Sequence, residues 1–313
     1  MLFKKLSLCL ALALALSGCT SNPTLKVNKN EPSNNKSTVS SGSADTSSET
    51  NPTDTPITPS VPTKGDSVVL NKPFTPIEVS NALGLQTKKI EWSWKYSPKD
   101  YATLLSKYHG YAFGDTSSKV IYLTFDEGYE YGYTPSILDT LKANNVKGAF
   151  FVTKDFVTGS FNGLKDIDLV KRMSNEGHLI CNHSVHHQSM PSFTIESTFN
   201  MELTGVESLV DNIPGLKISK FFRPPMGNFS ELSLYYTQKL GYKSIFFALA
   251  YSDWDTKNQP DPVTAKQNLL KETKPGMICL LHAESKTNAS ILDSLIKEWK
   301  SEGYEFKTLN ELP

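Results

Sequence analysis

Short apolar runs alternate with helix-like stretches from Lys119 to the end of the chain, and this alternation constrains the fold more than any other feature of the sequence. Strands that are joined by helical crossovers run parallel, and continuously apolar runs are typical of strands that are buried on both faces. The seven predicted strands are residues 120–125, 148–152, 179–181, 221–222, 245–250, 278–281 and 305–308. The six helices predicted between them are residues 135–144, 166–175, 195–210, 231–240, 262–273 and 289–302. We therefore expect an α/β domain, either a barrel or an open doubly wound sheet.

The aromatic side chains indicate where the folded part begins. Of the 33 Phe, Tyr and Trp residues, only Phe3 precedes Phe74, and a hydrophobic core needs such side chains. We therefore predict an N-terminal arm over residues 74–118, which includes Trp92 and packs on a domain formed by residues 119–313.

The first residues have the pattern of an export signal. Lys4 and Lys5 precede an apolar run over residues 6–16, which is too short to span a bilayer but is typical of a signal peptide. The sequence Leu-Ser-Gly-Cys that ends at Cys19 resembles a bacterial lipobox, in which the cysteine is lipidated and becomes the mature N-terminus. We predict a signal peptide over residues 1–18 and anchoring of the exported protein to the outer face of the cytoplasmic membrane. The alternative is an ordinary secretory leader with a chance cysteine.

A polar segment separates this signal from the folded part. Residues 20–64 contain 18 Ser or Thr, 6 Asn and 6 Pro and no aromatic residue, so they cannot bury enough apolar surface to offset the entropy of ordering. We predict a disordered tether over residues 19–73. Beyond it, Cys181 and Cys279 lie in apolar strand-like runs and are expected to be buried thiols rather than a disulfide framework.

Polar and reactive side chains cluster directly after the predicted strands, where α/β domains build their functional sites. Four of the six histidines belong to this group. Scattered surface residues would rarely fall on five strand ends in succession, so the pattern as a whole indicates a functional site. The group comprises Asp126, Glu127, His183, His186, His187, Arg223, Met226, Asp253, Trp254 and His282.

His183 and His187 stand four residues apart, so on one helical turn their imidazoles would face the same way and could share a metal ion. The spacing alone is common at solvent-facing positions, and its place after a buried strand is what favours a metal site. A zinc-protease motif would need Glu beside the first histidine, and Ser184 occupies that position.

The other candidates each allow a structural and a functional interpretation. Asp126 and Glu127 are adjacent carboxylates that could cap the following helix, or could serve as a general base and a group near the metal. His282 could be a core histidine, and Trp254 could be a packing residue or a substrate platform. Arg223 precedes two prolines, which stiffen the loop and fix the direction of the guanidinium.

Five short motifs resemble those of the NodB-type polysaccharide deacetylases, carbohydrate esterase family 4. They are Thr-Phe-Asp-Glu-Gly from residue 124, His-Ser-Val-His-His from residue 183, Arg-Pro-Pro-Met-Gly from residue 223, Asp-Trp from residue 253 and Leu-Leu-His from residue 280. Residues 123–135, 249–254 and 280–286 further resemble the PdaA-like branch, the peptidoglycan N-acetylmuramic acid deacetylases that lead to muramic δ-lactam. The resemblance runs from about Trp92 to Leu312 and implies a distorted (β/α)7 barrel.

The resemblance also implies a role for each candidate in the hydrolysis of an acetamide. Asp126 would be the general base, held in place by Arg223. His282 would be the general acid, oriented by Asp253. The backbone N–H of Met226 would help to stabilise the oxyanion.

A divalent metal ion bound by His183 and His187 is implied in the same way. Most of the family completes the metal site with a second Asp, whereas this chain has Glu127. The Glu side chain is one methylene longer, so it either reaches the metal by a shifted geometry or does not bind it. Imidazole and oxygen donors suit zinc, with manganese, magnesium or cobalt as alternatives.

The leading hypothesis is an enzyme that removes N-acetyl groups from N-acetylmuramic acid in peptidoglycan glycan strands, leading to muramic δ-lactam in the spore cortex. A deacetylase of N-acetylglucosamine or of O-acetylated polysaccharide is one alternative, and an inactive lipid-anchored wall-binding protein is another. The chain carries 32 basic and 32 acidic residues, so it lacks the basic surface that nucleic-acid binding requires. We expect a monomer.

Overall fold

Residues 73–93 and 101–313 are described by the structure, a computed structural model of the chain. The predicted signal peptide, the lipidation candidate Cys19 and all but the last residue of the predicted tether lie outside these residues. In the described part of the chain, no helix is long and apolar enough to cross a membrane.

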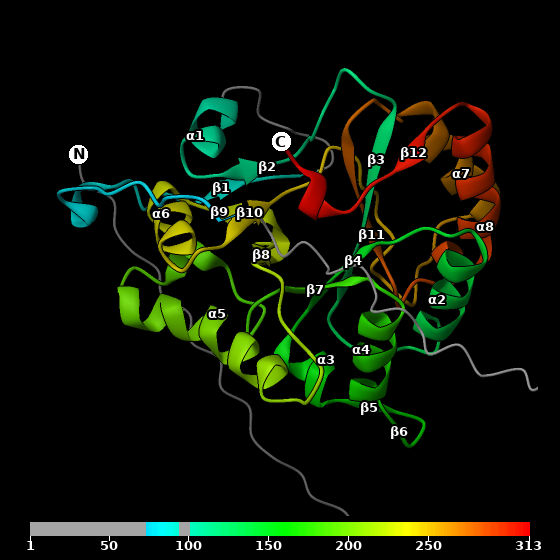
Figure 1. The fold of residues 1–313 in the computed structure, drawn as a ribbon, viewed down its shortest axis with the longest axis horizontal. Coiled ribbons are helices and arrows are strands. Elements are labelled where there is room, and N and C mark those ends of the chain that lie inside the picture. The colour runs from blue at the N-terminus through cyan, green and yellow to red at the C-terminus, as the bar shows by residue number, and fades with distance from the viewer. Residues whose placement is uncertain (1–72, 94–100) are drawn as a thin grey trace, which may run out of the picture. The chain divides into compact units, whose positions relative to one another are not determined.

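A parallel sheet of eight strands forms the centre of the fold (Figure 1). Its order is β11-β3-β4-β7-β8-β10-β2, and β12 pairs with β3 in addition. The strands are β2 (Gly110–Tyr111), β3 (Val120–Glu127), β4 (Ala149–Val152), β7 (Leu179–Asn182), β8 (Phe221–Phe222), β10 (Lys243–Ile245), β11 (Met277–His282) and β12 (Glu305–Phe306). Their pairings are all parallel, as helical crossovers require.

The sheet curls into a distorted barrel, and the gap between its two ends, β10 with β2 on one side and β11 on the other, is closed irregularly. Residues that follow β10 bridge the gap, since the N–H of Ala248 donates to the carbonyl of Ile278 and the N–H of Leu280 donates to that of Leu249, both at 2.9 Å. Leu249 also forms an isolated parallel bridge with Cys279. The strand predicted over residues 245–250 is thus regular only at its start. The predicted distorted barrel is confirmed, and the open doubly wound alternative is wrong.

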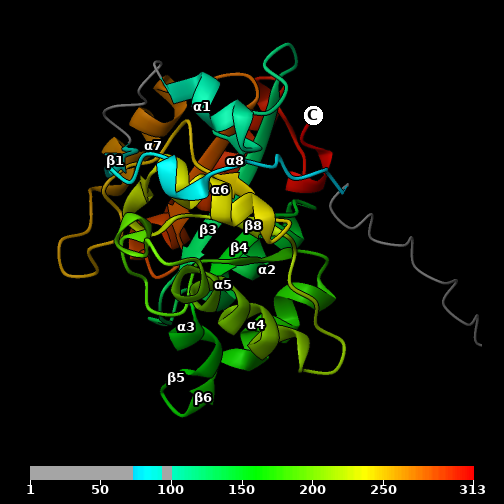
Figure 2. The ribbon, with the colours of Figure 1, turned by 90° about the vertical axis from the view of Figure 1, so that its left-hand side faces the viewer.

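Helices cover the outside of the sheet and contact one another in the order α7, α8, α2, α4, α3, α5 and α6 (Figures 1 and 2). They are α2 (Thr134–Ala143), α3 (Lys154–Thr158), α4 (Asp166–Asn175), α5 (Glu196–Asp211), α6 (Glu231–Lys239), α7 (Pro262–Lys271) and α8 (Lys286–Ser301). At four of the N-termini, the side chain of Thr153, Ser230, Asp261 or Ser285 accepts a hydrogen bond from a backbone N–H of the first turn. Every predicted helix is present, and α3 and the short α1 (Ala102–Lys107) are additional ones.

The remaining elements are short. They are α1 (Ala102–Lys107), the antiparallel pair β1 (Ile90–Glu91) and β9 (Asn228–Phe229), the hairpin of β5 (Ser160–Phe161) and β6 (Leu164–Lys165), and 3-10 turns at Ala82–Gly84, Met190–Ser192, Pro225–Gly227 and Leu309–Glu311.

The two faces of each strand have different neighbours. On β3, Tyr122 packs with Phe151 of β4 in a cluster inside the barrel, whereas Leu123 packs in the cluster between the sheet and the helices. Because successive side chains of a strand alternate in direction, Asp126 points into the barrel and Glu127 points outward. Both described cysteines are free and buried, as predicted.

The N-terminal arm packs on the loops that follow β8 and β10. The indole N–H of Trp92 donates to the carbonyl of Phe247 at 2.8 Å, and its backbone N–H donates to the carbonyl of Gly227 at 2.9 Å. Gly227 has a φ of +66°, and a Cβ at this position would lie 2.2 Å from the carbonyl oxygen of Trp92. Glycine is therefore required both by the left-handed conformation and by the close approach of the arm.

Gly227→Ala should destabilise the fold by more than the ~1–2 kcal/mol expected for left-handed backbone alone, because the added Cβ also displaces the arm. Gly215→Ala is the matched control, since Gly215 has a φ of +83° and nothing lies within 4 Å of its added Cβ. Urea unfolding of both variants measures the difference. Equal losses of stability would show that the contact with Trp92 has no structural importance.

Candidate active site

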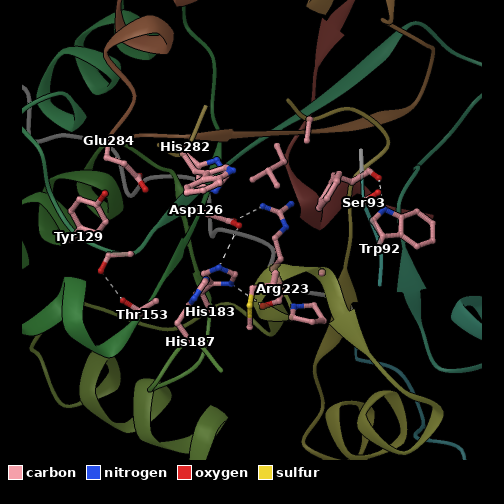
Figure 3. A pocket seen from close by; sticks show the side chains of 18 of the residues that line it. Trp92, Ser93, Asp126, Tyr129, Thr153, His183, His187, Arg223, His282 and Glu284 are labelled. Atoms are coloured by element: carbon pink, nitrogen blue, oxygen red, sulfur yellow. Dashed lines mark hydrogen bonds and ion pairs between the residues drawn. The ribbon is translucent and has the colours of Figure 1, made fainter. Parts of the chain in front are cut away.

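A cavity of about 660 Å³ opens at the carboxyl ends of the barrel strands (Figure 3). Among the predicted site residues, those that line it are Asp126, His183, His187, Arg223, Met226, Trp254 and His282. Asp253 lies behind His282, to which it is hydrogen-bonded. The strand ends therefore bring most of the predicted residues to one place.

Asp126 and Arg223 form a buried ion pair in the wall of this cavity. Nη1 of Arg223 donates to Oδ1 of Asp126 at 2.6 Å, and Nη2 donates to the hydroxyl of Thr124 at 2.8 Å. Burial alone would raise the pKa of Asp126, but the Arg223 guanidinium, together with His183 and His282, holds it below its ordinary value. Asp126 is therefore ionised at neutral pH, as a general base must be.

His183 and His187 approach each other in the cavity, with ring centroids 4.8 Å apart. Nδ1 of His183 lies 2.8 Å from the backbone carbonyl of Arg223, so it carries the proton, and Nε2 lies 3.4 Å from Oδ2 of Asp126. Burial lowers the pKa of both imidazoles, that of His183 to about 4. Both rings are therefore neutral at neutral pH, which is the form that binds a metal ion.

The helical turn expected from His183 to His187 is wrong. Residues 183–189 form a loop, in which Ser184 has a φ of +73° and His187 a φ of +50°. Side-chain hydrogen bonds support this strained backbone: Oδ1 of Asn182 accepts from the N–H of Ser184 at 3.0 Å, and Oγ of Ser184 accepts from the N–H of His187 at 2.9 Å. Two left-handed residues, rather than a helical turn, bring the imidazoles together.

Glu127 points away from the cavity, as the alternation along β3 requires. It is fully buried, and the hydroxyl of Thr134 donates to it at 3.4 Å. Burial, together with the carboxylates of Glu284 and Glu130, raises the pKa of Glu127 well above its ordinary value. Among the described residues, no group of three or more His, Cys, Asp and Glu side chains is placed to hold a metal ion. The structure therefore offers two imidazoles and does not bring Glu127 to them.

Asp253 and His282 form the second charged pair of the site. Nδ1 of His282 lies 2.7 Å from Oδ1 of Asp253, and the backbone N–H of His282 donates to Oδ2 at 2.9 Å. Burial alone would lower the pKa of His282, but Asp253, with Glu284 and Asp126, raises it to about 9. His282 is therefore protonated at neutral pH, as a general acid must be.

The structure adds cavity residues that the sequence pattern did not single out. Glu284 and Tyr129 lie on the opposite side of the cavity from Trp92 (Figure 3). Glu284 is 4% exposed, and burial raises its pKa to about 7. Glu284 and Tyr129 stand two or three residues beyond predicted candidates, so a wider window at each strand end would have found them. No such position in the sequence pointed to Trp92, because it lies in the N-terminal arm and not after a predicted strand.

Large apolar side chains surround the cavity mouth. Trp254 is 59% exposed, Met226 57% and Tyr129 48%. Exposed apolar surface around a cavity is typical of a binding site. Met226 has a φ of +56°, so the loop after β8, like the loop that holds Ser184 and His187, places a non-glycine residue in the left-handed conformation.

Comparisons with known proteins identify the family of this chain. Residues 113–245 match the family model described as polysaccharide deacetylase. The chain is 40% identical over 242 residues to the peptidoglycan-N-acetylmuramic acid deacetylase PdaA of Bacillus subtilis, covering 74% of this chain and 89% of that protein. The chain belongs to the polysaccharide deacetylase family. The solved structure of Bacillus subtilis PdaA, a family 4 carbohydrate esterase, matches with a TM-score of 0.68 over 73% of this chain and 98% of that one.

Two further relatives support the assignment of this polysaccharide deacetylase. A family 4 carbohydrate esterase from Bacillus anthracis is 38% identical, with a TM-score of 0.62 over 73% of this chain and 97% of that one. A peptidoglycan-N-acetylglucosamine deacetylase of Bacillus cereus is 31% identical over 206 residues, covering 64% of this chain and 71% of that protein. The predicted family is confirmed, and the chain is a hydrolase that removes N-acetyl groups.

The pairing of Asp253 with His282 predicts how the activity of this deacetylase depends on pH. If His282 is the general acid, the value of kcat/KM should hold through neutral pH and fall above about pH 9, because His282 then loses its proton. Asp253→Asn removes the charge that raises the pKa of His282, so the fall should begin at lower pH. Profiles of kcat/KM against pH for both proteins measure this. An unmoved alkaline limb would exclude Asp253 as the partner of the acid.

Proposed function

We propose that this deacetylase acts on peptidoglycan, where it removes the acetyl group of N-acetylmuramic acid and so leads to muramic δ-lactam in the spore cortex. The main support is the presence of two opposed pairs in one cavity: the ionised Asp126 with Arg223, and the cationic His282 with Asp253. Amide hydrolysis needs both, because water must lose a proton and the amine must gain one. The 40% identity to a muramic acid deacetylase supports the choice of sugar.

In the proposed reaction, Asp126 accepts a proton from the attacking water while Arg223 holds its carboxylate in place. The backbone N–H of Met226 helps to stabilise the oxyanion. His282 then donates its proton to the nitrogen of the departing amine, and acetate leaves. The freed muramic amine closes on the lactyl carboxyl group of the same sugar with loss of water, which gives the lactam. Trp254, at the cavity mouth, is the proposed platform for a sugar ring.

We propose that His183 and His187 hold a divalent metal ion, zinc in the first place, with manganese, magnesium or cobalt as alternatives. Two neutral imidazoles that line the same cavity fit this donor set. When bound, the metal would polarise the acetyl carbonyl and make the attacking water more acidic. Glu127 is not part of the proposed site, because it points out of the barrel.

N-acetylglucosamine is the second candidate sugar, since a relative named for that substrate is 31% identical. Mass spectrometry of glycan fragments after incubation of peptidoglycan with the purified protein separates the two. Loss of acetyl from muramic acid, followed by loss of water, is the expected result. Loss of acetyl from glucosamine alone would replace the first proposal by the second.

Asp126→Asn should reduce kcat by roughly 10²–10⁴-fold, the usual contribution of one general base. The amide keeps the shape of the side chain but cannot accept the proton of water. Metal content, measured by elemental analysis, should stay at the level of the parent protein. A variant that keeps parental kcat would show that another group is the base.

Replacement of either metal-binding histidine should remove metal and activity together. His183→Ala and His187→Ala are each expected to lose bound metal in elemental analysis while circular dichroism shows an intact fold. Glu127→Asn is the control, with a smaller loss of activity and unchanged metal content. Full metal occupancy in the double histidine variant would refute the site. A loss of metal in Glu127→Asn equal to that of His183→Ala would make Glu127 a ligand.

We also propose that the protein is exported and anchored to the cytoplasmic membrane through a lipidated Cys19, which the Leu-Ser-Gly-Cys sequence supports. Cys19→Ala should release the protein from the membrane fraction in a detergent-partition assay. A variant that still sediments with membranes would rule out the lipid anchor.

A further inference from the structure

Asn288, in the first turn of α8, lies behind the Asp253–His282 pair. Its side chain is fully buried. Nδ2 donates to Oδ2 of Asp253 at 2.6 Å and to the backbone carbonyl of His282 at 2.9 Å. Oδ1 accepts a hydrogen bond from the hydroxyl of Tyr251. Asn288 thus contacts both members of the pair as well as a third residue that supports them.

A side-chain amide is the group that fits this position. The hydroxyl of Tyr251 needs an acceptor, while the Asp253 carboxylate and the His282 carbonyl need donors, and an amide supplies one acceptor and two donors in one plane. A carboxylate at residue 288 could not donate a hydrogen bond, although the Asp253 carboxylate and the His282 carbonyl both need a donor. An aliphatic side chain would take one hydrogen bond from each of these buried polar groups.

The position of Asp253 depends on such contacts, because no helix or strand lies between Leu249 and Pro262. Gln259 joins this loop to α8: its Nε2 donates to the carbonyl of Asp253 at 2.7 Å, and its Oε1 accepts from the hydroxyl of Ser285 at 2.6 Å. The hydroxyl oxygen of Ser285 in turn accepts from the N–H of Asn288 at 3.1 Å. The loop and the N-terminal turn of α8 therefore form one hydrogen-bonded unit with Asn288 in it.

We propose that Asn288 is a positioning residue for the proton transfer. It holds the Asp253 carboxylate and the His282 backbone in one arrangement, so that the imidazole of His282 keeps its proton and its direction. This inference rests on the proposed role of His282 as the general acid. Asn288 is not among the described residues that line the cavity, so it acts through Asp253 and His282 rather than on the substrate. The other titratable groups that face His282 are Glu284, Asp126 and His187, and they stay unchanged in the variants below.

Asn288→Leu in the full-length enzyme tests the proposal by two measurements. The first is the profile of kcat/KM against pH on peptidoglycan, and the second is the pKa of His282 from ¹⁵N NMR of its imidazole. We expect kcat to fall about tenfold or more, by analogy with the loss that follows when the hydrogen-bond partner of a metal-binding histidine is removed. The pKa of His282 should fall below that of the parent, and the alkaline limb of the profile should move with it. Tyr251→Phe, which removes one oxygen atom, should shift the pKa of His282 and the alkaline limb in the same direction, but by less.

Asn144→Ala is the matched control, because Asn144 also donates from Nδ2 to an aspartate, Asp293, at 2.9 Å, away from the cavity. It should leave kcat and the pKa of His282 at parental values. A parental His282 pKa in folded Asn288→Leu would overturn the proposal, even if kcat fell, because Asn288 would then be merely structural. Should Asn288→Leu not fold, Tyr251→Phe decides by the same criterion. If the parent does not deacetylate peptidoglycan, the proposed function fails, while the NMR titration still tests the role of Asn288.

Discussion

The buried guanidinium of Arg223 is the interaction on which the site depends. It donates to Asp126 on β3 and, through Nε, to the carbonyl of Ile245 on β10 at 3.2 Å, and it lies 4.1 Å over the ring of Phe151 on β4. One side chain thereby links three strands of the barrel where the cavity begins. Its own backbone carbonyl orients His183. Removing one partner of a buried ion pair destabilises a protein by about 3–5 kcal/mol, because the other charge stays buried.

Two carboxylates with different partners keep the site in the charge state that hydrolysis needs. Asp126 is paired with an arginine, which is always charged, so it remains an anion. Asp253 is paired with a histidine, which titrates, so it keeps His282 cationic to about pH 9. His183 has no such carboxylate on its Nδ1, and burial keeps it neutral. Opposed environments thus place an anionic carboxylate, a cationic imidazolium and a neutral imidazole in one cavity.

The sequence could predict the parallel strands, the helices and most of the cavity, because the carboxyl ends of parallel strands collect in space whatever the details of packing. The strand pattern alone allowed a barrel or an open sheet, and the family resemblance favoured the barrel. The outward direction of Glu127 could also have been predicted, since it follows the inward Asp126 and side chains alternate along a strand. The loop between His183 and His187 could not, because the spacing of the histidines does not reveal the left-handed Ser184. The contacts of Asn288 with Asp253 join residues 35 apart in the chain, and no local pattern marks them.

The central claim is that Asp126 and His282 move different protons, and His282→Ala tests it most directly. An activated acetyl ester has a leaving group that needs no proton, whereas the amine of an acetamide does. The variant should therefore hydrolyse the ester nearly as well as the parent does, and lose roughly 10²–10⁴-fold in kcat on the amide. Equal losses on ester and amide would contradict the account, because the acid that protonates the leaving amine would then be another group.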